Sequence, residues 1–560
     1  MGTWGASAAL ALVMAPLAGA TDPPTFAHDI APIIYEKCAP CHQPGAAAPF
    51  SLLTYQDVQK RAAQIAAATR AGFMPPWLPQ RGYGDFAGNR RLTAEPIATI
   101  AAWVGAGAPE GKGAEIPPPP TLPDGWQLGK PDLVLEAPGP IPLPASGRDI
   151  YWNVIFTPNL TARRWVRAIQ IRPGRPRVVH HANLLVDRAG SAHLLEKSPG
   201  QGFPGMDLEI GRSPFDPDGN FLFWKPGGAP HVEPDGFAWR LDPGNELVLN
   251  LHLQPSGKKE ELRPSVGLYF TDRPQTKFPL LVELENDQAL DIPAGARDFA
   301  ISDEFKLPLD ADVLAVYPHA HYLGKLLEAY AALPDGSKKW LIRIPAWDPN
   351  WQAVFYYREP VFLPKDSVIH MRYRYDNSAA NLRNPNHPPK RVRSGNRATD
   401  EMGHLWLQML PRGAGDRRRG LQEAVMRHRL DKNPNDAVAH RNLGAILLSR
   451  LDPQAAVTEL RAAARLEPNQ PEVHNMLGLG LATLNRNAEA IPQFEIALRE
   501  RPDYASARFN LATSLAKSGR IDEAVANLRQ ILAANPGDAY AKQRLADLMA
   551  TQAPRRPSLN

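Results

Sequence analysis

The chain has 560 residues, of which 44% are apolar, so it can fill several globular cores, and three or four domains are expected. Its formal net charge is only +5, which argues against a surface specialised for nucleic acid or for a membrane. Proline is abundant, with 58 residues, and this favours a loop-rich or β-rich body.

Residues 1–20, MGTWGASAALALVMAPLAGA, are apolar and end in small residues, as a secretory signal peptide does, although they contain no Lys or Arg. A mis-assigned start or a disordered tail is the alternative. No later stretch has 18 unbroken apolar residues, so no transmembrane span is expected after the signal. We therefore expect a periplasmic or secreted protein.

The only two cysteines of the chain lie in CAPCH, residues 38–42. Two residues between cysteines, followed by His, is the attachment pattern of c-type haem. Cys38 and Cys41 would form the thioether bonds to a covalent haem c, and His42 would bind the iron. A chance match or a redox pair of cysteines is the alternative.

The second axial ligand of the iron is expected to be Met74, in FMPPW, although a purely structural methionine is the alternative. The surrounding sequence resembles the small cytochrome c domains of large bacterial secreted proteins. Helices before CAPCH and at Glu95–Val104 fit that fold. Residues 24–113 are thus predicted to be an electron-transfer domain, and residues 114–130 a Pro-rich linker.

Short runs of Val, Ile, Leu and Tyr then alternate with Pro, Gly and Asp turns up to about residue 411. This alternation of apolar runs and turns predicts an all-β region of sandwich type. Because the region is long for one sandwich, we expect two in tandem, at residues 131–272 and 273–411.

Residues 417–551 carry a repeat of 34 residues. Positions that keep this step include the prolines Pro434, Pro468, Pro502 and Pro536 and the small residues Gly444, Gly478, Ala512 and Ala546. The period predicts tetratricopeptide repeats, an all-α solenoid whose concave surface binds a protein partner. The alternative is an array that merely packs on its own β-region.

Histidines gather at three places in the β-region. His319 and His321 are two apart, so in a strand both imidazoles share one face and can share one metal. His180 and His181 are adjacent, so they can bind one metal only with a bulge, a turn or different ring nitrogens. His252, in a strand-like segment, is a third candidate for that site.

Met402 is expected in a late strand with His404 on the same face. Two imidazoles and one thioether form a soft ligand set that favours Cu(I) over zinc, and three imidazoles favour a copper that changes its oxidation state. For each residue alone, ordinary packing is the alternative. His404 is an extra ligand, a substrate contact or a packing residue.

The order of several motifs resembles copper type II, ascorbate-dependent monooxygenases, the superfamily of dopamine β-hydroxylase and the peptide-amidating hydroxylase, over roughly residues 131–411. The motifs are HHANLLVD (180–187), LHLQPSGK (251–258), PHAHYLGK (318–325), WDPNWQ (347–352), YDNSAANLRNPN (375–386) and ATDEMGHLWLQML (398–410). The resemblance implies two jelly-roll β-sandwiches with one copper in each.

By motif matching, His180, His181 and His252 would hold an electron-relay copper. His319, His321 and Met402 would hold the copper that activates oxygen. The disulfides of the animal members are absent here. The amidating branch grips a carboxylate with an Arg two residues before HxH, where this chain has Tyr317, so a peptide C-terminal glycine is not the expected substrate.

The sequence thus predicts a secreted copper-dependent monooxygenase that hydroxylates a C–H bond of a small molecule or peptide with O₂. Its haem domain would take electrons from a periplasmic donor and stand in for ascorbate. A tether raises the effective concentration of the haem near the copper domain to roughly millimolar. The alternatives are a non-catalytic haem and copper carrier or copper-handling protein, and a scaffold whose metal sites have decayed.

Overall fold

The computed structural model describes residues 22–44, 48–112, 116–119, 125–188, 192–206 and 219–552. The predicted signal peptide, residues 1–20, lies outside them. The chain forms two compact units, one from Met1–Trp77 and Arg90–Thr121 and the other from Leu78–Asn89 and Leu122–Asn560. Within the described part of the chain, no helix has the length and apolar character that crossing a membrane requires.

The first unit is helical and is built around fully buried aromatic residues. Phe26 and Trp103 lie in its core, and the Trp103 indole donates a hydrogen bond to the Pro109 carbonyl, 2.9 Å away. Its elements are a π-helical turn (Phe26–Ile30), α1 (Ala31–Lys37), α2 (Tyr55–Gln59), α3 (Ala62–Arg70) and α4 (Ala94–Gly105). Helices therefore stand where the sequence placed them, before the CAPCH motif and over Glu95–Val104.

The second unit contains a β-rich part whose first half we call the first β-region. Its strands form a four-stranded sheet (β1-β11-β4-β8), a five-stranded sheet (β6-β3-β9-β5-β7) and a small pair (β10-β2), all antiparallel. The strands are β1 (Leu133–Glu136), β2 (Ile141–Leu143), β3 (Ile150–Phe156), β4 (Arg164–Arg172), β5 (Val179–Asp187), β6 (Phe203–Pro204), β7 (Phe223–Trp224), β8 (Trp239–Leu241), β9 (Glu246–Leu253), β10 (Glu260–Leu262) and β11 (Ser265–Thr271).

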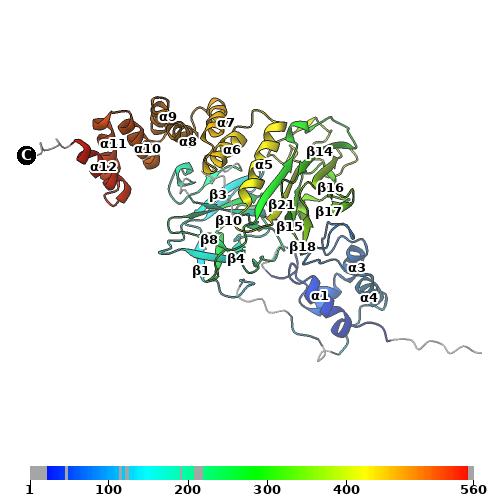
Figure 1. The fold of residues 1–560 in the computed structure, drawn as a ribbon. Coiled ribbons are helices and arrows are strands. Elements are labelled where there is room, and N and C mark those ends of the chain that lie inside the picture. The colour runs from blue at the N-terminus through cyan, green and yellow to red at the C-terminus, as the bar shows by residue number, and fades with distance from the viewer. Residues whose placement is uncertain are drawn as a thin grey trace, which may run out of the picture. The chain divides into compact units, whose positions relative to one another are not determined.

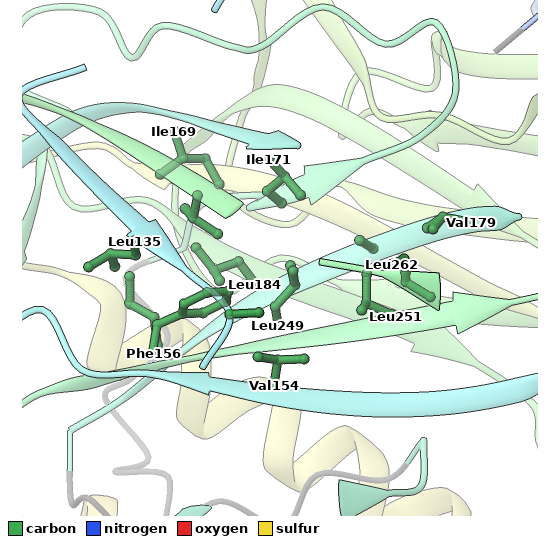
Figure 2. Close-up of a cluster of buried hydrophobic side chains, with 14 of the residues drawn as sticks. Leu135, Val154, Phe156, Ile169, Ile171, Val179, Leu184, Leu249, Leu251 and Leu262 are labelled. Atoms are coloured by element: carbon green, nitrogen blue, oxygen red, sulfur yellow. The ribbon is translucent and has the colours of Figure 1, made fainter. Parts of the chain in front are cut away.

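One apolar cluster joins the two larger sheets of the first β-region (Figure 2). Ile169 and Ile171 come from one sheet, and Val154, Leu249 and Leu251 from the other. Because successive side chains of a strand face opposite ways, each sheet can turn one apolar face to this cluster. The cluster fixes the sheet that carries the first group of histidines.

The second half, which we call the second β-region, has sheets of order β12-β21-β15-β18 and β14-β19-β16-β17 and a small pair, β13-β20. In β14 burial alternates residue by residue, as expected of a strand with one face in the core. The strands are β12 (Leu280–Glu285), β13 (Asp291–Ile292), β14 (Phe299–Lys306), β15 (Ala311–His319), β16 (Gly324–Ala332), β17 (Lys338–Ile344), β18 (Phe355–Leu363), β19 (Val368–Tyr375), β20 (Val392–Arg393) and β21 (His404–Pro411).

A short segment from the N-terminal part of the sequence, Leu78–Asn89, belongs to the second unit. The ring of Phe86 is buried against Tyr357 of β18, with 4.9 Å between ring centroids. The amide of Ala87 donates to the Tyr356 carbonyl at 2.9 Å. The segment thereby adds hydrogen bonds to β18, which is otherwise the edge strand of its sheet.

The C-terminal part is a helical repeat region, as the 34-residue period predicted (Figure 1). Helices α6, α8, α10 and α12 begin 34 residues apart, and so do α7, α9 and α11. The helices are α5 (Arg418–Lys432), α6 (Ala437–Ser449), α7 (Pro453–Leu466), α8 (Pro471–Thr483), α9 (Asn487–Glu500), α10 (Ala505–Lys517), α11 (Ile521–Ala534) and α12 (Ala539–Gln552).

The same hydrogen bond recurs in successive repeats of this region. His440 Nε2 lies 3.0 Å from the Pro434 carbonyl, and His474 Nε2 lies 2.9 Å from the Pro468 carbonyl. One repeat later, an Arg508 guanidinium N–H donates to the Pro502 carbonyl at 2.5 Å. The repeated prolines therefore mark a loop that a side chain of the following helix holds in place.

The first helix of the repeat region, α5, packs on the second β-region. Asp303 of β14 is buried, and its carboxylate lies 2.9 Å from His428 Nε2 and 2.7 Å from the Lys432 ammonium, both on α5. A buried carboxylate requires such partners. The alternative of packing on the chain's own β-region therefore describes α5, whereas α6 to α12 make their main contacts with one another.

Replacing Gly478 by Ala should destabilise the repeat region by ~1–3 kcal/mol, because overpacking displaces neighbouring side chains. An added Cβ at Gly478 would come within 2.6 Å of the Phe494 ring. The matched control is Gly420→Ala in α5, where the added Cβ meets nothing closer than 3.8 Å, and which should stabilise by about 0.4–1 kcal/mol. Thermal unfolding of both variants checks this, and equal shifts would contradict it.

Candidate metal centres

A β-bulge brings His180, His181 and His252 together. In the pairing of β5 with β9, Val179 lies opposite Leu253 and His181 lies opposite His252, so His180 is the extra residue. A bulge re-aims side chains that would otherwise face opposite ways. One ring nitrogen from each histidine lies within 4.8 Å of the others. We call this set the first triad.

Among the described residues, two ring nitrogens of the first triad are buried without a hydrogen-bond partner. His252 Nε2 lies 2.8 Å from the Asp149 carboxylate, and its Nδ1 is buried without a protein partner. His180 Nε2 is likewise buried and unpartnered, and the Nδ1 atoms of His180 and His181 are 3.1 Å apart. Because unpaired buried polar atoms are costly, this arrangement fits a bound cation.

Burial lowers the pKa of two of these imidazoles, those of His180 and His181. Burial, and after it the neighbouring His252, lowers the pKa of His180 to about 4. Burial also lowers the pKa of His181 well below its usual value. A neutral imidazole offers a lone pair to a metal without first losing a proton, so the first triad suits a metal at neutral pH.

The second group of predicted ligands meets where β15 and β21 pair. His319 is the last residue of β15 and lies opposite His404. The expectation that His321 shares the strand is wrong, because β15 ends at His319, and Met402 precedes β21 instead of lying in it. The same register, continued past the ends of the strands, sets Met402 opposite His321.

A buried carboxylate clamps the two segments of this second group. Glu401 Oε1 accepts from the backbone N–H groups of His321 and Met402, at 2.8 Å for the latter. Its Oε2 accepts from the Leu323 N–H at 2.9 Å. The Tyr375 hydroxyl donates to the Met402 carbonyl at 2.9 Å. These bonds fix the backbone on both sides of the predicted second site.

The Nδ1 atoms of His319 and His321 are hydrogen-bonded to protein oxygens. His319 Nδ1 donates to the Gln352 side-chain oxygen at 2.8 Å, and His321 Nδ1 donates to the Asp400 carbonyl at 3.0 Å. Burial lowers the pKa of both imidazoles. Each ring therefore keeps Nε2 as the nitrogen with a free lone pair, as a metal ligand requires. We call His319, His321 and Met402 the second set.

His404 is an ion-paired residue, which resolves the choice that the sequence left open. Its Nδ1 lies 3.0 Å from a Glu283 oxygen and its Nε2 lies 3.1 Å from Asp287. Burial lowers the pKa of His404, but the two carboxylates outweigh burial and raise it to about 10. With both nitrogens protonated, His404 has no lone pair for a metal.

In the first unit, the turn after α1 presents Cys38, Cys41 and His42. Cys38 and Cys41 form no disulfide, and burial raises the pKa of Cys38 to about 12. His42 Nδ1 donates to the Phe50 carbonyl at 3.2 Å, which leaves Nε2 as the nitrogen available to an iron.

Met74 lies half-buried in the loop after α3, where its amide donates to the Ala68 carbonyl at 3.2 Å. Within the described residues, Met74 shares no hydrogen bond with His42, so its place as the second axial ligand stays a prediction.

Three supporting residues were missed from the sequence: Asp149, Gln352 and Glu401. None is a predicted ligand, and each acts by holding a ligand in one orientation. Gln352 and Glu401 stand in motifs that carry the family resemblance, WDPNWQ and ATDEMGHLWLQML, and this proximity was the signal available. Asp149 is 103 residues from His252 in sequence, and no pattern links them.

Comparison with protein families matches the C-terminal region. The tetratricopeptide repeat family model matches residues 475–548, so the C-terminal region contains tetratricopeptide repeats. No curated protein matches.

Among solved structures, one titled "Crystal structure of MamA" is similar at 20% identity and a TM-score of 0.23, over 24% of this chain and 78% of the other. Another is titled "Crystal structure of YrrB: a TPR protein with an unusual peptide-binding site". It is similar at 22% identity and a TM-score of 0.24, over 25% of this chain and 72% of the other.

Replacing Asp149 by Asn should lower the copper affinity of the first triad by about 10–100-fold, the usual effect of losing a partner that orients a ligand. The hydrogen bond to His252, above all, holds the pKa of Asp149 low, so its charge is present at neutral pH. Copper titration of the purified protein measures the change. Asp298→Asn, which removes a half-exposed carboxylate paired with Arg374, is the control, and an unchanged affinity in Asp149→Asn would contradict the role.

Replacing His404 by Gln should destabilise the protein by ~3–5 kcal/mol at pH 6, because it leaves two carboxylates without their buried cation. The folded pKa of about 10 exceeds the ordinary 6.5, so the stabilisation is full below pH 6.5 and is lost as the pH rises through about 10. Denaturant unfolding across this range should show the gap between wild type and variant shrinking. A gap that stays constant would rule this out.

Proposed function

We propose that the protein is a copper-dependent monooxygenase that hydroxylates a C–H bond of an organic substrate with O₂, with electrons supplied through a covalent haem c. The observation that carries the proposal is the pairing of two ligand groups. The first triad and the second set each gather buried imidazoles, and burial lowers the pKa of His181 in the first and of His319 in the second. Two metal sites of this kind agree with the copper monooxygenase resemblance of the sequence.

The residues present fit copper better than zinc. Three imidazoles suit a copper that changes its oxidation state, and two imidazoles with the thioether of Met402 lean towards Cu(I). Copper bound at the second set would supply the reduction of O₂ to a species able to take hydrogen from a C–H bond. The two β-regions, each with two larger antiparallel sheets, support the two jelly-roll sandwiches that the resemblance implies.

Aromatic rings surround the second set and give it apolar character. Tyr317 stacks on Trp406 with 5.4 Å between ring centroids and lies 5.3 Å from the Phe223 ring of the first β-region. Trp406 in turn lies 6.3 Å from His319. Such rings exclude water and offer an organic substrate a contact surface. Tyr317 presents no cation, so a carboxylate is not the group that this surface selects.

The haem module would deliver electrons. His42 already has the hydrogen bond that an iron-binding imidazole needs, and the thiols at 38 and 41 precede it. A periplasmic or secreted location, with a periplasmic electron donor, goes with this chemistry. The tetratricopeptide repeats add a surface for a protein partner.

Replacing Met402 by Leu tests the function, because it preserves the side-chain volume and removes the sulfur. We expect reduction-dependent O₂ uptake to fall by about 100-fold or more, since supporting residues of metal sites already cost 10–100-fold. The haem spectrum and its reduction should persist. An oxygen electrode with iron and copper analysis per chain provides the measurement.

The matched control is Met409→Leu, a buried methionine of β21 that belongs to neither ligand group. It should keep wild-type uptake. Full uptake in Met402→Leu would remove the site assignment. Copper that cycles with the haem while wild type consumes no O₂ would favour the electron-carrier alternative.

A further inference from the structure

We propose that the side-chain amide of Gln352 joins the first triad to the second set, so that electrons pass between the two metal sites through the protein. The inference rests on the proposed function. Gln352 follows a 3₁₀ turn, Pro349–Trp351, and is 3% exposed. It stands between a histidine of the first β-region and a histidine of the second.

The amide oxygen of Gln352 fixes the ring of His319. It accepts from His319 Nδ1 and from the Tyr317 hydroxyl, each at 2.8 Å. A carbonyl oxygen can only accept, so His319 must carry its proton on Nδ1 and keep the lone pair on Nε2. Gln352 thus sets which nitrogen of His319 faces a metal.

The amide nitrogen of the same side chain reaches the other site. Gln352 Nε2 lies 3.5 Å from Nδ1 of His181, a member of the first triad. The side-chain amide of Gln352 therefore contacts His319 of the second set through its oxygen and His181 of the first triad through its nitrogen. The two contacts of this one side chain give an electron a short path through the protein.

The turn that carries Gln352 is held from both sides. The buried Trp347 indole donates to the carbonyls of Ala320 and His321, both at 3.1 Å, which ties the turn to the second set. The Lys225 ammonium, from the first β-region, donates to the Trp351 carbonyl at 3.5 Å. These hydrogen bonds hold the turn in one conformation, so the side chain of Gln352 is pre-organised between the two sites.

The proposed step transfers one electron from the first site to the second site. With a copper bound at each site, the first copper would lose one electron and the second copper would gain it. No bond forms or breaks, and no proton moves. A haem held by Cys38, Cys41 and His42 would resupply the electron to the first copper, and O₂ would be the final acceptor.

The test uses the full-length, haem-loaded protein with Cu(II) at both sites, mixed with reduced mitochondrial cytochrome c, a donor too large to enter the site. Rapid-freeze EPR follows the loss of each Cu(II) signal. In Gln352→Leu, reduction of the second site should slow by about 10–100-fold, the range for lost supporting contacts, while the first site is reduced at the wild-type rate. In Gln352→Glu, the acceptor for His319 remains, so the EPR parameters of the second site should stay close to wild type.

The matched control is Gln408→Leu. Gln408 is also buried, and its amide also crosses between the β-regions, donating to the Gly219 carbonyl at 2.9 Å. Among the described residues it hydrogen-bonds to no imidazole. Equal slowing in Gln408→Leu, or wild-type reduction of the second site in copper-loaded Gln352→Leu, would overturn the bridge and leave the proposed function standing. A wild-type protein that binds no copper at the second set would overturn the function first.

Discussion

A buried imidazole has lost the water that would satisfy its two nitrogens, and this constraint organises the centre of the molecule. The protein supplies an acceptor for one nitrogen of each of three rings: Asp149 for His252, Gln352 for His319 and the Asp400 carbonyl for His321. The other nitrogen stays free. The surrounding strands, the bulge in β5 and the hydrogen bonds to Glu401 hold these rings in place, with one nitrogen of each ring hydrogen-bonded and the other without a partner among the described residues.

The same constraint separates histidines that look alike in the sequence. His404 lies two residues from Met402, yet carboxylates hold both of its nitrogens, and it is a buried cation that stabilises β12 and β21. The rings of the first triad face one another, and burial lowers the pKa of His180 and His181. A histidine predicted to bind a metal therefore differs from an ion-paired histidine in the hydrogen-bond partners of its two ring nitrogens. The residue type alone does not show these partners.

Sequence patterns predicted those features that depend on spacing. The 34-residue step located the helices and the close approach at Gly478. The adjacency of His180 and His181 left a bulge, a turn or different ring nitrogens open, and β5 contains the bulge. Features that depend on distant pairing were not accessible, because nothing local marks Asp149 as the partner of His252. The strand end at His319 was also missed, since a pattern of alternating residues does not say where hydrogen bonding stops.

The hydrogen bonds to the proline carbonyls of the repeat region show how this region can change in length without altering the β-regions. Each loop is held by a side chain six positions further on, inside its own repeat. A duplicated or deleted 34-residue repeat would include both the proline carbonyl and the side chain that hydrogen-bonds to it. Lineages could lengthen or shorten the partner-binding surface in unit steps while the histidine-bearing strands stay untouched.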